Sequence, residues 1–452
     1  MRARTSVAVV LAALLATSSA LAGGMVLPIR GVRSLSRGGA FIAGADDAES
    51  LWHDPAGLAH LAGNGKRALL FDAAFVYQTV QHTRIDSEGT VHPTVENQLP
   101  GRAIPTLAGA LGVGERLVIA GGLGAPYQAF HRYGDQGPQR YASVSVTDAT
   151  FAQITIGAAY KIDDRLRVGA TLSNLVSRAT VKLVVDGCPG AMVCAPEDPA
   201  FDALVEIEQV DYLAPSGSLG VQYDATETIT LGLAAHAPAV IAGEGELRFT
   251  PPRQVAFEDA TVTGDRGSLE LVALPPMIRA GVELRPRPDL RIEVALGIEL
   301  WSLHDDIVIA PREITVESPA LGSLPLAEMT IPRDYKTSFA PAIAIEWHGP
   351  KLMLGGGYSY ETAAAPASHV SVLTVDAAKH LVGIGGGYED AGWQIGAAFG
   401  IAQLAEVETT LETAKVPQLR PLDDDTTAPG IANAGTYRSR YLVAGLRFTR
   451  FW

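Results

Sequence analysis

The residues most suggestive of chemistry are His53 and Asp54, which are neighbours in the segment Leu-Trp-His-Asp-Pro-Ala-Gly-Leu at residues 51–58. An imidazole and a carboxylate together can move a proton in acid–base catalysis. Adjacent residues rarely orient for such a relay, however, and we find no serine- or cysteine-centred nucleophile motif. The sequence therefore predicts no catalytic residues and no enzyme.

Cys188 and Cys194 are the only two cysteines. Two thiols without a nearby histidine make a poor metal site, so metal ligation is the weaker interpretation. In an oxidising compartment the pair is expected to form a disulfide in an exposed extracellular loop, with a contribution on the order of 2 kcal/mol.

Other candidate ligand sites are weak. The acidic runs Asp305–Asp306 and Asp423–Asp425 are typical of solvated loops, so we predict no metal. The glycine runs Gly355–Gly357 and Gly385–Gly387 lack the strand-to-helix context of a dinucleotide site, so we predict no cofactor. We expect these glycines to be close-packing positions that face the N-terminal segment.

Composition narrows the class of protein. The 452-residue chain is 47% hydrophobic and has a formal net charge of −14, which argues against nucleic acid as a partner. No apolar run of transmembrane-helix length follows the N-terminal region, so the apolar residues are spread over short segments. The 47 glycines and 28 prolines favour many turns over long helices.

Residues 1–22 have the pattern of a cleavable export signal. Arg2 and Arg4 are followed by an apolar core, Val7–Leu15, and by a small-residue cleavage site at Ala20–Ala22. No cysteine follows the predicted cut, which disfavours a lipid-anchored lipoprotein. We therefore expect the mature protein to begin near Gly23.

From residue 66 to residue 452 the sequence consists of alternating apolar and polar segments. In Arg291–Leu300 every second residue is apolar, and the closing segment Tyr441–Trp452 ends on an aromatic residue, as lipid-facing strands of outer-membrane barrels do. Fourteen candidate strands follow this pattern: 67–83, 102–112, 116–127, 141–161, 166–186, 203–223, 228–250, 268–286, 290–311, 331–348, 351–361, 379–389, 393–410 and 436–452. The predicted fold is an all-β transmembrane antiparallel β-barrel of about 14 strands.

Residues 23–65 show no sustained alternation and are expected to form a compact plug. Within them, Gly38–Ala48 followed by Asp54-Pro-Ala-Gly-Leu58 resembles the N-terminal hatch of the FadL-like family of outer-membrane transporters of long-chain fatty acids and aromatic hydrocarbons. Further segments resemble the family in the same order: Pro126–Tyr127, Arg140–Tyr141, Gly355–Glu361 and Ala377–Tyr388. One departure is Asp54, because the family usually has asparagine before Pro-Ala.

This resemblance implies a hatch inside the barrel and passage of hydrophobic compounds without ATP. It assigns a gating role to the hatch residues His53, Asp54, Pro55, Ala56 and Gly57. It also implies a kinked third strand with a lateral opening at Gly121, Gly122, Gly124 and Pro126, where glycine and proline interrupt regular pairing. An ordinary glycine-rich strand end is the alternative interpretation of that segment.

The expected location is the bacterial cell outer membrane. The expected partners are a hydrophobic small molecule (a fatty acid or a hydrocarbon), outer-membrane lipid and the barrel assembly machinery, with a monomeric protein. Two other functions remain open: an outer-membrane enzyme barrel of the lipase or protease type, and a structural or adhesive barrel without transport.

Overall fold

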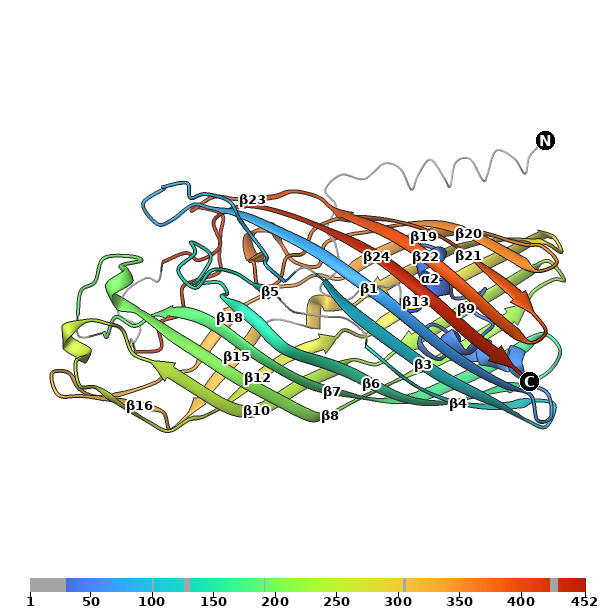
Figure 1. The fold of residues 1–452 in the computed structure, drawn as a ribbon, viewed down its shortest axis with the longest axis horizontal. Coiled ribbons are helices and arrows are strands. Elements are labelled where there is room, and N and C mark those ends of the chain that lie inside the picture. Colours follow the sequence, from blue (N-terminus) through green and yellow to red (C-terminus); the bar gives the residue numbers. More distant parts are fainter. Residues whose placement is uncertain (1–29, 100, 126–130, 191, 304–305, 423–429) are drawn as a thin grey trace.

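The computed structural model describes residues 30–99, 101–125, 131–190, 192–303, 306–422 and 430–452, so the predicted export signal lies outside the described residues. The chain forms a closed antiparallel β-barrel (Figure 1). The first strand, β1 (Arg67–Arg84), pairs with the last, β24 (Gly435–Phe451), from Ala68 against Phe451 to Arg84 against Gly435. This pairing closes the barrel and confirms the predicted fold class.

The wall contains 14 strands, as predicted, but several are interrupted. In order around the barrel the segments are β1, β3 (Gly101–Val113), β4 (Leu117–Gly124) with β5 (His131–Arg132), β6 (Ser145–Lys161), β7 (Leu166–Asp186), β8 (Asp202–Asp224), β9 (Ile229–His236) with β10 (Ala239–Thr250), β12 (Arg266–Leu274) with β13 (Met277–Arg287), β14 (Leu290–Glu299) with β15 (Asp306–Arg312), β18 (Met329–Pro332) with β19 (Ser338–His348), β20 (Leu352–Glu361), β21 (Lys379–Asp390), β22 (Trp393–Leu404) with β23 (Val407–Thr409), and β24. Prolines stand at some breaks, such as Pro238 between β9 and β10, because proline cannot donate a ladder hydrogen bond.

A few elements lie outside this wall. Strand β2 (Val95–Glu96) pairs with the far end of β1. A small sheet and four 3₁₀ turns occupy the long connections: β11 (Thr261–Thr263), β16 (Thr315–Ser318), β17 (Gly322–Pro325), η3 (Pro199–Phe201), η4 (Val255–Phe257), η5 (Trp301–Leu303) and η6 (Ala367–His369). Within the described ranges, no helix has both the length and the apolar character needed to cross a membrane.

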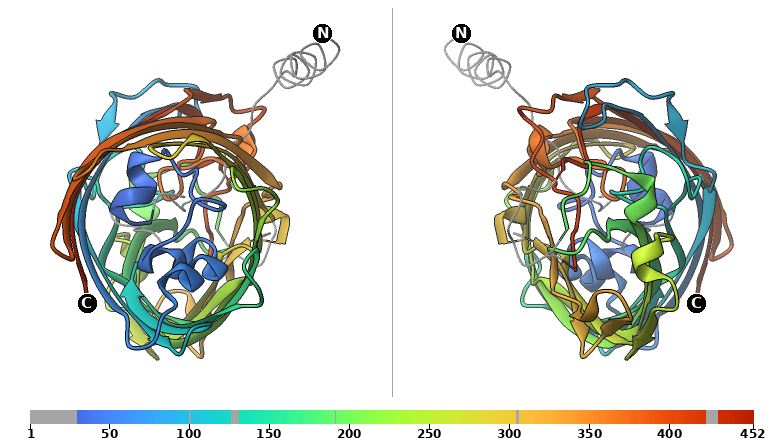
Figure 2. Two further views of the ribbon diagram at one scale, coloured as in Figure 1. Left: turned by 90° about the vertical axis from the view of Figure 1, so that its right-hand side faces the viewer. Right: turned by 90° about the vertical axis from the view of Figure 1, so that its left-hand side faces the viewer.

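The segment before β1 lies inside the ring of strands (Figure 2). It contains a short helix, α2 (Val32–Ser36), and two 3₁₀ helices, η1 (Ala48–Trp52) and η2 (Pro55–Leu61). We call this segment, from residue 30 to residue 65, the hatch. It fills one end of the barrel, the end at which the C-terminus lies; we call this the hatch end and the opposite one the loop end.

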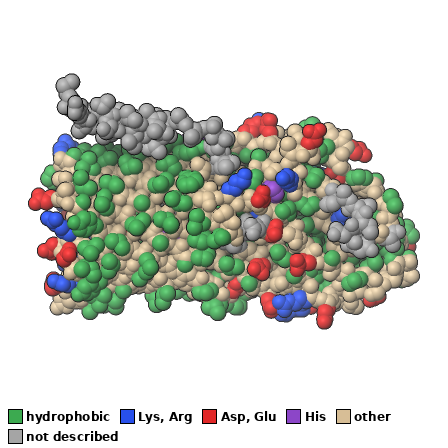
Figure 3. Space-filling view, turned by 180° about the vertical axis from the view of Figure 1, so that it is seen from behind, with side chains coloured by type: hydrophobic (Ala, Val, Ile, Leu, Met, Phe, Trp, Pro, Cys, Tyr) green, Lys and Arg blue, Asp and Glu red, His purple; other side chains and the backbone are tan. Residues whose placement is uncertain are grey.

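The exterior carries a band of exposed apolar side chains on the half nearer the hatch end (Figure 3). Leu172 and Leu219, on neighbouring strands, are 70% and 65% exposed. Large apolar side chains that point outward all around a barrel are stable against hydrocarbon rather than water. Nearer the loop end, charged residues such as Arg178 and Glu208 replace them on the same strands. We call the apolar band the apolar belt.

Candidate functional site

The predicted hatch residues build a local turn. The side chain of Asp54 caps η2, because the backbone N–H of Ala56 donates to Asp54 Oδ1 at 3.0 Å. Pro55 occupies the first turn of η2, where its missing N–H costs nothing. Gly57 packs so tightly that an added Cβ would lie 2.2 Å from the carbonyl oxygen of Ala45. The motif therefore fixes the path of the hatch backbone.

The turn packs directly against two glycines of the barrel wall. Gly169 of β7 and Gly220 of β8 are direct partners across the strand pair. A Cβ on Gly169 would lie 2.3 Å from the carbonyl carbon of Pro55, and one on Gly220 would lie 2.0 Å from Asp54 Oδ1. The hatch can contact the wall here because both positions lack a side chain.

Asp54 is fully buried, and its Oδ2 has no hydrogen-bond partner among the described residues. Burial raises the pKa of Asp54 well above its usual range. The neutral carboxyl is therefore favoured in the folded hatch. A neutral carboxyl has a carbonyl acceptor and a donor, as asparagine does, which explains how aspartate fits where the resembling family usually has asparagine.

His53 links the hatch to the wall through its ring. Its Nδ1 lies 3.2 Å from Arg279 Nη1 of β13, and its Nε2 lies 2.6 Å from the carbonyl oxygen of Arg30. Because a guanidinium can only donate, Nδ1 must accept, and the ring proton lies on Nε2. Both ring nitrogens are thus engaged in structural hydrogen bonds, and His53 and Asp54 do not bond to each other in the described contacts.

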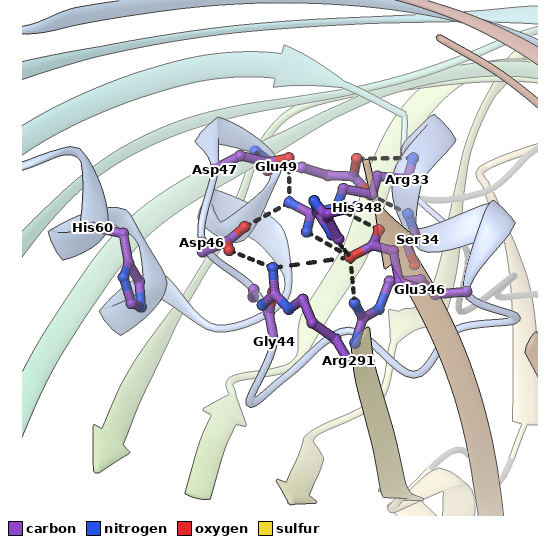
Figure 4. Close-up of polar contacts among 12 residues, drawn as sticks. Arg33, Ser34, Gly44, Asp46, Asp47, Glu49, His60, Arg291, Glu346 and His348 are labelled. Atoms are coloured by element: carbon purple, nitrogen blue, oxygen red, sulfur yellow. Dashed lines mark hydrogen bonds and ion pairs between the residues drawn. The ribbon is translucent and has the colours of Figure 1, made fainter. Parts of the chain in front are cut away.

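Ionic contacts hold the hatch against the wall at the hatch end (Figure 4). Arg33 of α2 contacts Asp46 at 2.5 Å and Glu346 of β19 at 2.9 Å. Arg37 contacts Glu293 of β14 at 2.6 Å and the same Glu346 at 2.9 Å. The full cluster, which we call the charged seat, comprises Arg33, Arg37, Arg291, Arg447, Asp46, Asp47, Glu49, Asp72, Glu283, Glu293 and Glu346.

Arg447 of β24 shows how closely hatch and wall are joined. Its guanidinium contacts Asp72 of β1 at 3.0 Å and Asp47 of the hatch at 3.0 Å, and it also pairs with Glu49. The Glu293 carboxylate, in turn, accepts hydrogen bonds from three consecutive hatch N–H groups at 2.8 to 3.0 Å. These contacts tie the hatch to strands on several sides of the barrel.

Sequence reasoning did not single out the charged seat. A signal was present in Arg291–Leu300, where Arg291 and Glu293 occupy the inward positions of a strand whose outward positions are apolar. The expected close packing of the glycine runs is confirmed at Gly357 and Gly385. A Cβ on Gly357 would lie 2.1 Å from the carbonyl carbon of Arg37, and one on Gly385 would lie 2.7 Å from the Cβ of Ser36.

The glycines assigned to a lateral opening lie at the end of β4. Gly121 and Gly122 pair in unbroken register with both neighbouring strands. A Cβ on Gly121 would meet no atom closer than 3.6 Å, whereas one on Gly122 would lie 2.7 Å from the ring of Trp52 in η1. Gly124 is the last residue of β4, and Pro126 lies outside the described residues.

In the part of the chain that the structure describes, β4 ends at Gly124 and β5 begins at His131. Strand β3 pairs with β4 only through residues 107–113, and β6 pairs with β4 through residues 153–160 and with β5 through residues 145–146. Residues 101–106 of β3 and 147–152 of β6 therefore have no strand partner on their facing sides among the described residues. Phe75 of β1, beside Ala103 and 49% exposed, places these residues of β3 within the apolar belt.

The lumen on the loop side of the hatch contains an apolar cavity of about 60 Å³. Its lining includes Val146, Val181, Ile241, Leu269, Ile309 and Ile331. We call this the apolar cavity. These side chains come from β6, β7, β10, β12, β15 and β18. The cavity is therefore bounded by inward-facing residues of several strands of the barrel wall.

Cys188 and Cys194 form a disulfide with a Cα–Cα distance of 6.2 Å. Both lie in the connection between β7 and η3, at the loop end of the barrel. Cys188 is fully buried in the hydrophobic cluster of the loop end and Cys194 packs against that cluster, so the disulfide is confirmed but its predicted exposure is wrong for Cys188.

A closed barrel with an apolar belt and an internally held plug defines a class of outer-membrane transport barrel. The chain belongs to the family of outer membrane protein transport proteins (OMPP1/FadL/TodX), whose model matches residues 13–441. Members of this family are channels of the outer membrane rather than enzymes, which confirms the predicted location and the absence of an enzyme assignment.

Solved structures share the fold at low sequence identity. A FadL homologue of Pseudomonas aeruginosa is 16% identical over 94% of this chain and 99% of its own, with a TM-score of 0.76. The Pseudomonas putida toluene transporter TodX is 14% identical over 96% of this chain and 100% of its own, with a TM-score of 0.64. The CymD monoaromatic hydrocarbon channel is 14% identical over 94% and 97%, with a TM-score of 0.59. No curated protein matches the sequence.

Proposed function

We propose that this outer-membrane channel passes long-chain fatty acids or related hydrophobic compounds passively through the lumen and releases them sideways into the bilayer. The hatch end is the periplasmic end, because its connections are short turns such as residues 162–165 and 225–228. The observation that carries the proposal is the apolar cavity on the extracellular side of the hatch, together with residues 101–106 of β3 and 147–152 of β6, which have no strand partner on their facing sides among the described residues.

The apolar cavity supplies the driving force for entry. Burial of apolar surface is worth about 25 cal/mol per Å², which a water-filled pore cannot provide. Relatives with this fold include a toluene transporter and a monoaromatic hydrocarbon channel, which handle apolar solutes. A purely structural or adhesive barrel would have no need for such a cavity.

The charged seat argues against axial passage. Removal of one partner from a buried ion pair costs on the order of 3–5 kcal/mol, and displacement of the whole hatch would separate many such pairs at once. We therefore propose that His53, Asp54, Pro55, Ala56 and Gly57 keep the hatch in place during transport. Their contribution to gating is to block the axial route.

The lateral route follows from this block. A solute that leaves between β3 and β6 enters hydrocarbon, where each buried CH2 is worth about 0.8 kcal/mol, instead of periplasmic water. Outer-membrane lipid is thus the immediate acceptor. We further propose that the barrel is a monomer and that the barrel assembly machinery inserts it into the outer membrane.

Uptake measurements test this function. Cells that carry the protein should take up labelled fatty acid or toluene faster than cells without it. Gly124→Val adds a side chain next to Thr106, in the stretch of β3 without a strand partner on this side among the described residues. It should reduce uptake severalfold without preventing barrel folding, which is checked by heat-modifiable migration.

Gly121→Val is the matched control on the same strand, because a Cβ there would meet no atom closer than the carbonyl oxygen of Thr155 at 3.6 Å. Equal uptake with and without the protein would overturn the transport proposal. Normal uptake in a folded Gly124→Val protein would overturn the lateral route.

A further inference from the structure

Charged side chains gather on the outer face of five neighbouring strands, beyond the apolar belt toward the loop end. The strands are β7, β8, β10, β12 and β15, which pair with one another in this order (Figure 1). Six of their outward side chains form a surface that we call the outer patch: Arg178, Glu208, Glu244, Glu246, Arg266 and Arg312. Pairs such as Lys182 with Glu206 continue it toward the loops.

The outer patch lies at the level of the extracellular head groups. A tilted strand needs about 9–11 residues to cross the hydrocarbon. Because β7 leaves its periplasmic turn at Leu166, the hydrocarbon ends near residue 176, and Arg178 is the next outward residue. On β8, Tyr212 is 74% exposed close to this boundary, as interfacial aromatic residues are. The patch therefore faces lipid head groups and not acyl chains.

Two cross-strand positions of the patch place like charges side by side. Glu208 of β8 lies directly opposite Glu246 of β10, and Arg266 of β12 lies directly opposite Arg312 of β15. Like charges at directly opposed positions destabilise a sheet. An ion of opposite charge from outside the protein would relieve each of these two contacts.

Arg266 and Arg312 together form an anion-binding position. Arg266 has Glu246 as its neighbour on the other side, but Arg248 already holds that carboxylate at 2.6 Å, and Arg266 contacts no carboxylate among the described residues. Arg312 contacts Glu244 at 2.6 Å, and both of these side chains are more than half exposed. Exposed ion pairs of this kind contribute little to stability. Both guanidinium groups can therefore turn to an external anion.

We propose that the outer patch binds the phosphorylated glycolipid of the outer leaflet, lipopolysaccharide, and that Arg266 and Arg312 hold one of its phosphates. A guanidinium offers paired N–H donors that match phosphate oxygens. The glutamates fit the same partner, because divalent cations link the phosphates of this leaflet, and Glu208 and Glu246 can share such a cation with a phosphate. An anionic lipid without bound cations would be repelled by these carboxylates. The proposal uses the orientation of the barrel and is independent of transport.

Two matched glycolipid probes test this inference on the purified, folded protein in detergent. The probes are lipid A and the same lipid A after enzymatic removal of its phosphates, so that sugars and acyl chains are shared. With Mg²⁺ present, the intact protein should bind the phosphorylated form more tightly, by about tenfold, since hydrogen bonds to charged groups are the stronger ones. The double variant Arg266→Gln, Arg312→Gln should lose this preference and keep its affinity for the dephosphorylated form. Heat-modifiable migration checks that the variant is folded.

Three further variants separate the contributions of the patch. Arg266→Lys, Arg312→Lys retains both charges and should retain the preference for phosphate. Arg438→Gln, an exposed basic residue on β24 that pairs with Glu406, is the matched control and should leave both affinities unchanged. Glu208→Gln, Glu246→Gln removes the carboxylates that would share a cation, so the lipid A affinity of this variant should respond less to chelation of Mg²⁺ than that of the intact protein.

Equal binding of the two probes by the intact protein, or an unchanged preference in the folded Arg266→Gln, Arg312→Gln protein, overturns the proposal. Equally tight binding of phosphatidylglycerol would assign the patch to anionic lipid in general. A dimer that the glutamine variant loses would assign it to a second copy of this chain. Either result overturns the proposal too, and all of them leave the proposed transport function to its own uptake test.

Discussion

The two halves of the lumen are both buried, yet they are built from opposite chemistry. The periplasmic half contains the charged seat, in which each arginine has several fixed carboxylate partners. In the extracellular half a large cluster of apolar side chains surrounds the apolar cavity, and a buried ion pair such as Lys379–Glu361 lies beside it without contacting the hatch. Ion pairs in a buried site need specific partners at specific distances, whereas apolar contacts do not.

The two regions therefore suit different tasks: one holds the hatch in place, and the other can bind a hydrophobic solute. The charged seat is suited to one occupant, the hatch, whose arginines and backbone N–H groups match the wall carboxylates. The apolar cavity is suited to occupants that differ in shape but share low polarity. One barrel can thus be closed to water by a fixed plug and still accept a hydrophobic solute above it.

The largest expected effect comes from breaking the charged seat. Arg447→Met leaves Asp72 and Glu49 buried without their main partner and should weaken the hatch by about 3–5 kcal/mol. Hydrogen–deuterium exchange of hatch peptides should rise, and liposomes that contain the variant should admit small hydrophilic probes. Both measurements report on the hatch instead of the barrel wall.

Arg438→Met provides the matched control on the same strand. Arg438 is exposed on the outer face and pairs with Glu406, so its loss should leave hatch exchange unchanged. If the two variants behaved alike, the charged seat would not be what holds the hatch.

A smaller effect is expected in the apolar half. Ile309→Asn replaces a fully buried side chain of the apolar cavity by a polar one, and oleyl alcohol should bind about tenfold more weakly. Val308→Asn, the neighbouring position on β15, points to the other face of the strand and should bind normally. Equal affinity in both variants would place the binding site elsewhere in the lumen.

The strands of the wall and their inward and outward faces could largely be predicted from the sequence. Alternation along Arg291–Leu300 gives both the strand and its two faces, and the fourteen alternating segments correspond to the strands of the wall. The breaks inside strands were not predicted, because a segment such as residues 228–250 keeps its alternation on both sides of Pro238. Local pattern identifies strands well but not the places where their partner changes.

The partners within the charged seat could not be predicted. Arg33 and Glu346 are 313 positions apart, and nothing local to either residue indicates the other. Single-sequence reasoning finds inward-facing charges on strands, but their pairing depends on the closure of the barrel.

The smallest expected effect concerns the one carboxyl of the hatch that lies outside the charged seat, Asp54. Burial raises its folded pKa well above the unfolded value near 3.9, so the folded hatch retains a proton that the unfolded segment loses above about pH 4. The free energy that opposes hatch opening should therefore fall as pH rises from about 4 toward the folded pKa. Asp54→Asn keeps the acceptor for the Ala56 N–H and cannot ionise. It should match the unsubstituted protein near pH 4 and resist opening by about 1 kcal/mol more at pH 8.

Hydrogen–deuterium exchange of the peptide that contains η2, corrected for the intrinsic pH dependence of exchange, measures this difference directly. Asp164→Asn is the control, because its side chain is 98% exposed in a periplasmic turn and should not change hatch exchange at any pH. If the Asp54→Asn protein kept the full pH slope of the unsubstituted hatch, another group would be titrating. The neutral form of Asp54 would then not explain how the hatch accommodates an aspartate. The contrast between the charged seat, whose side chains are ionised and paired, and the uncharged turn that packs against Gly169 and Gly220 would also fail.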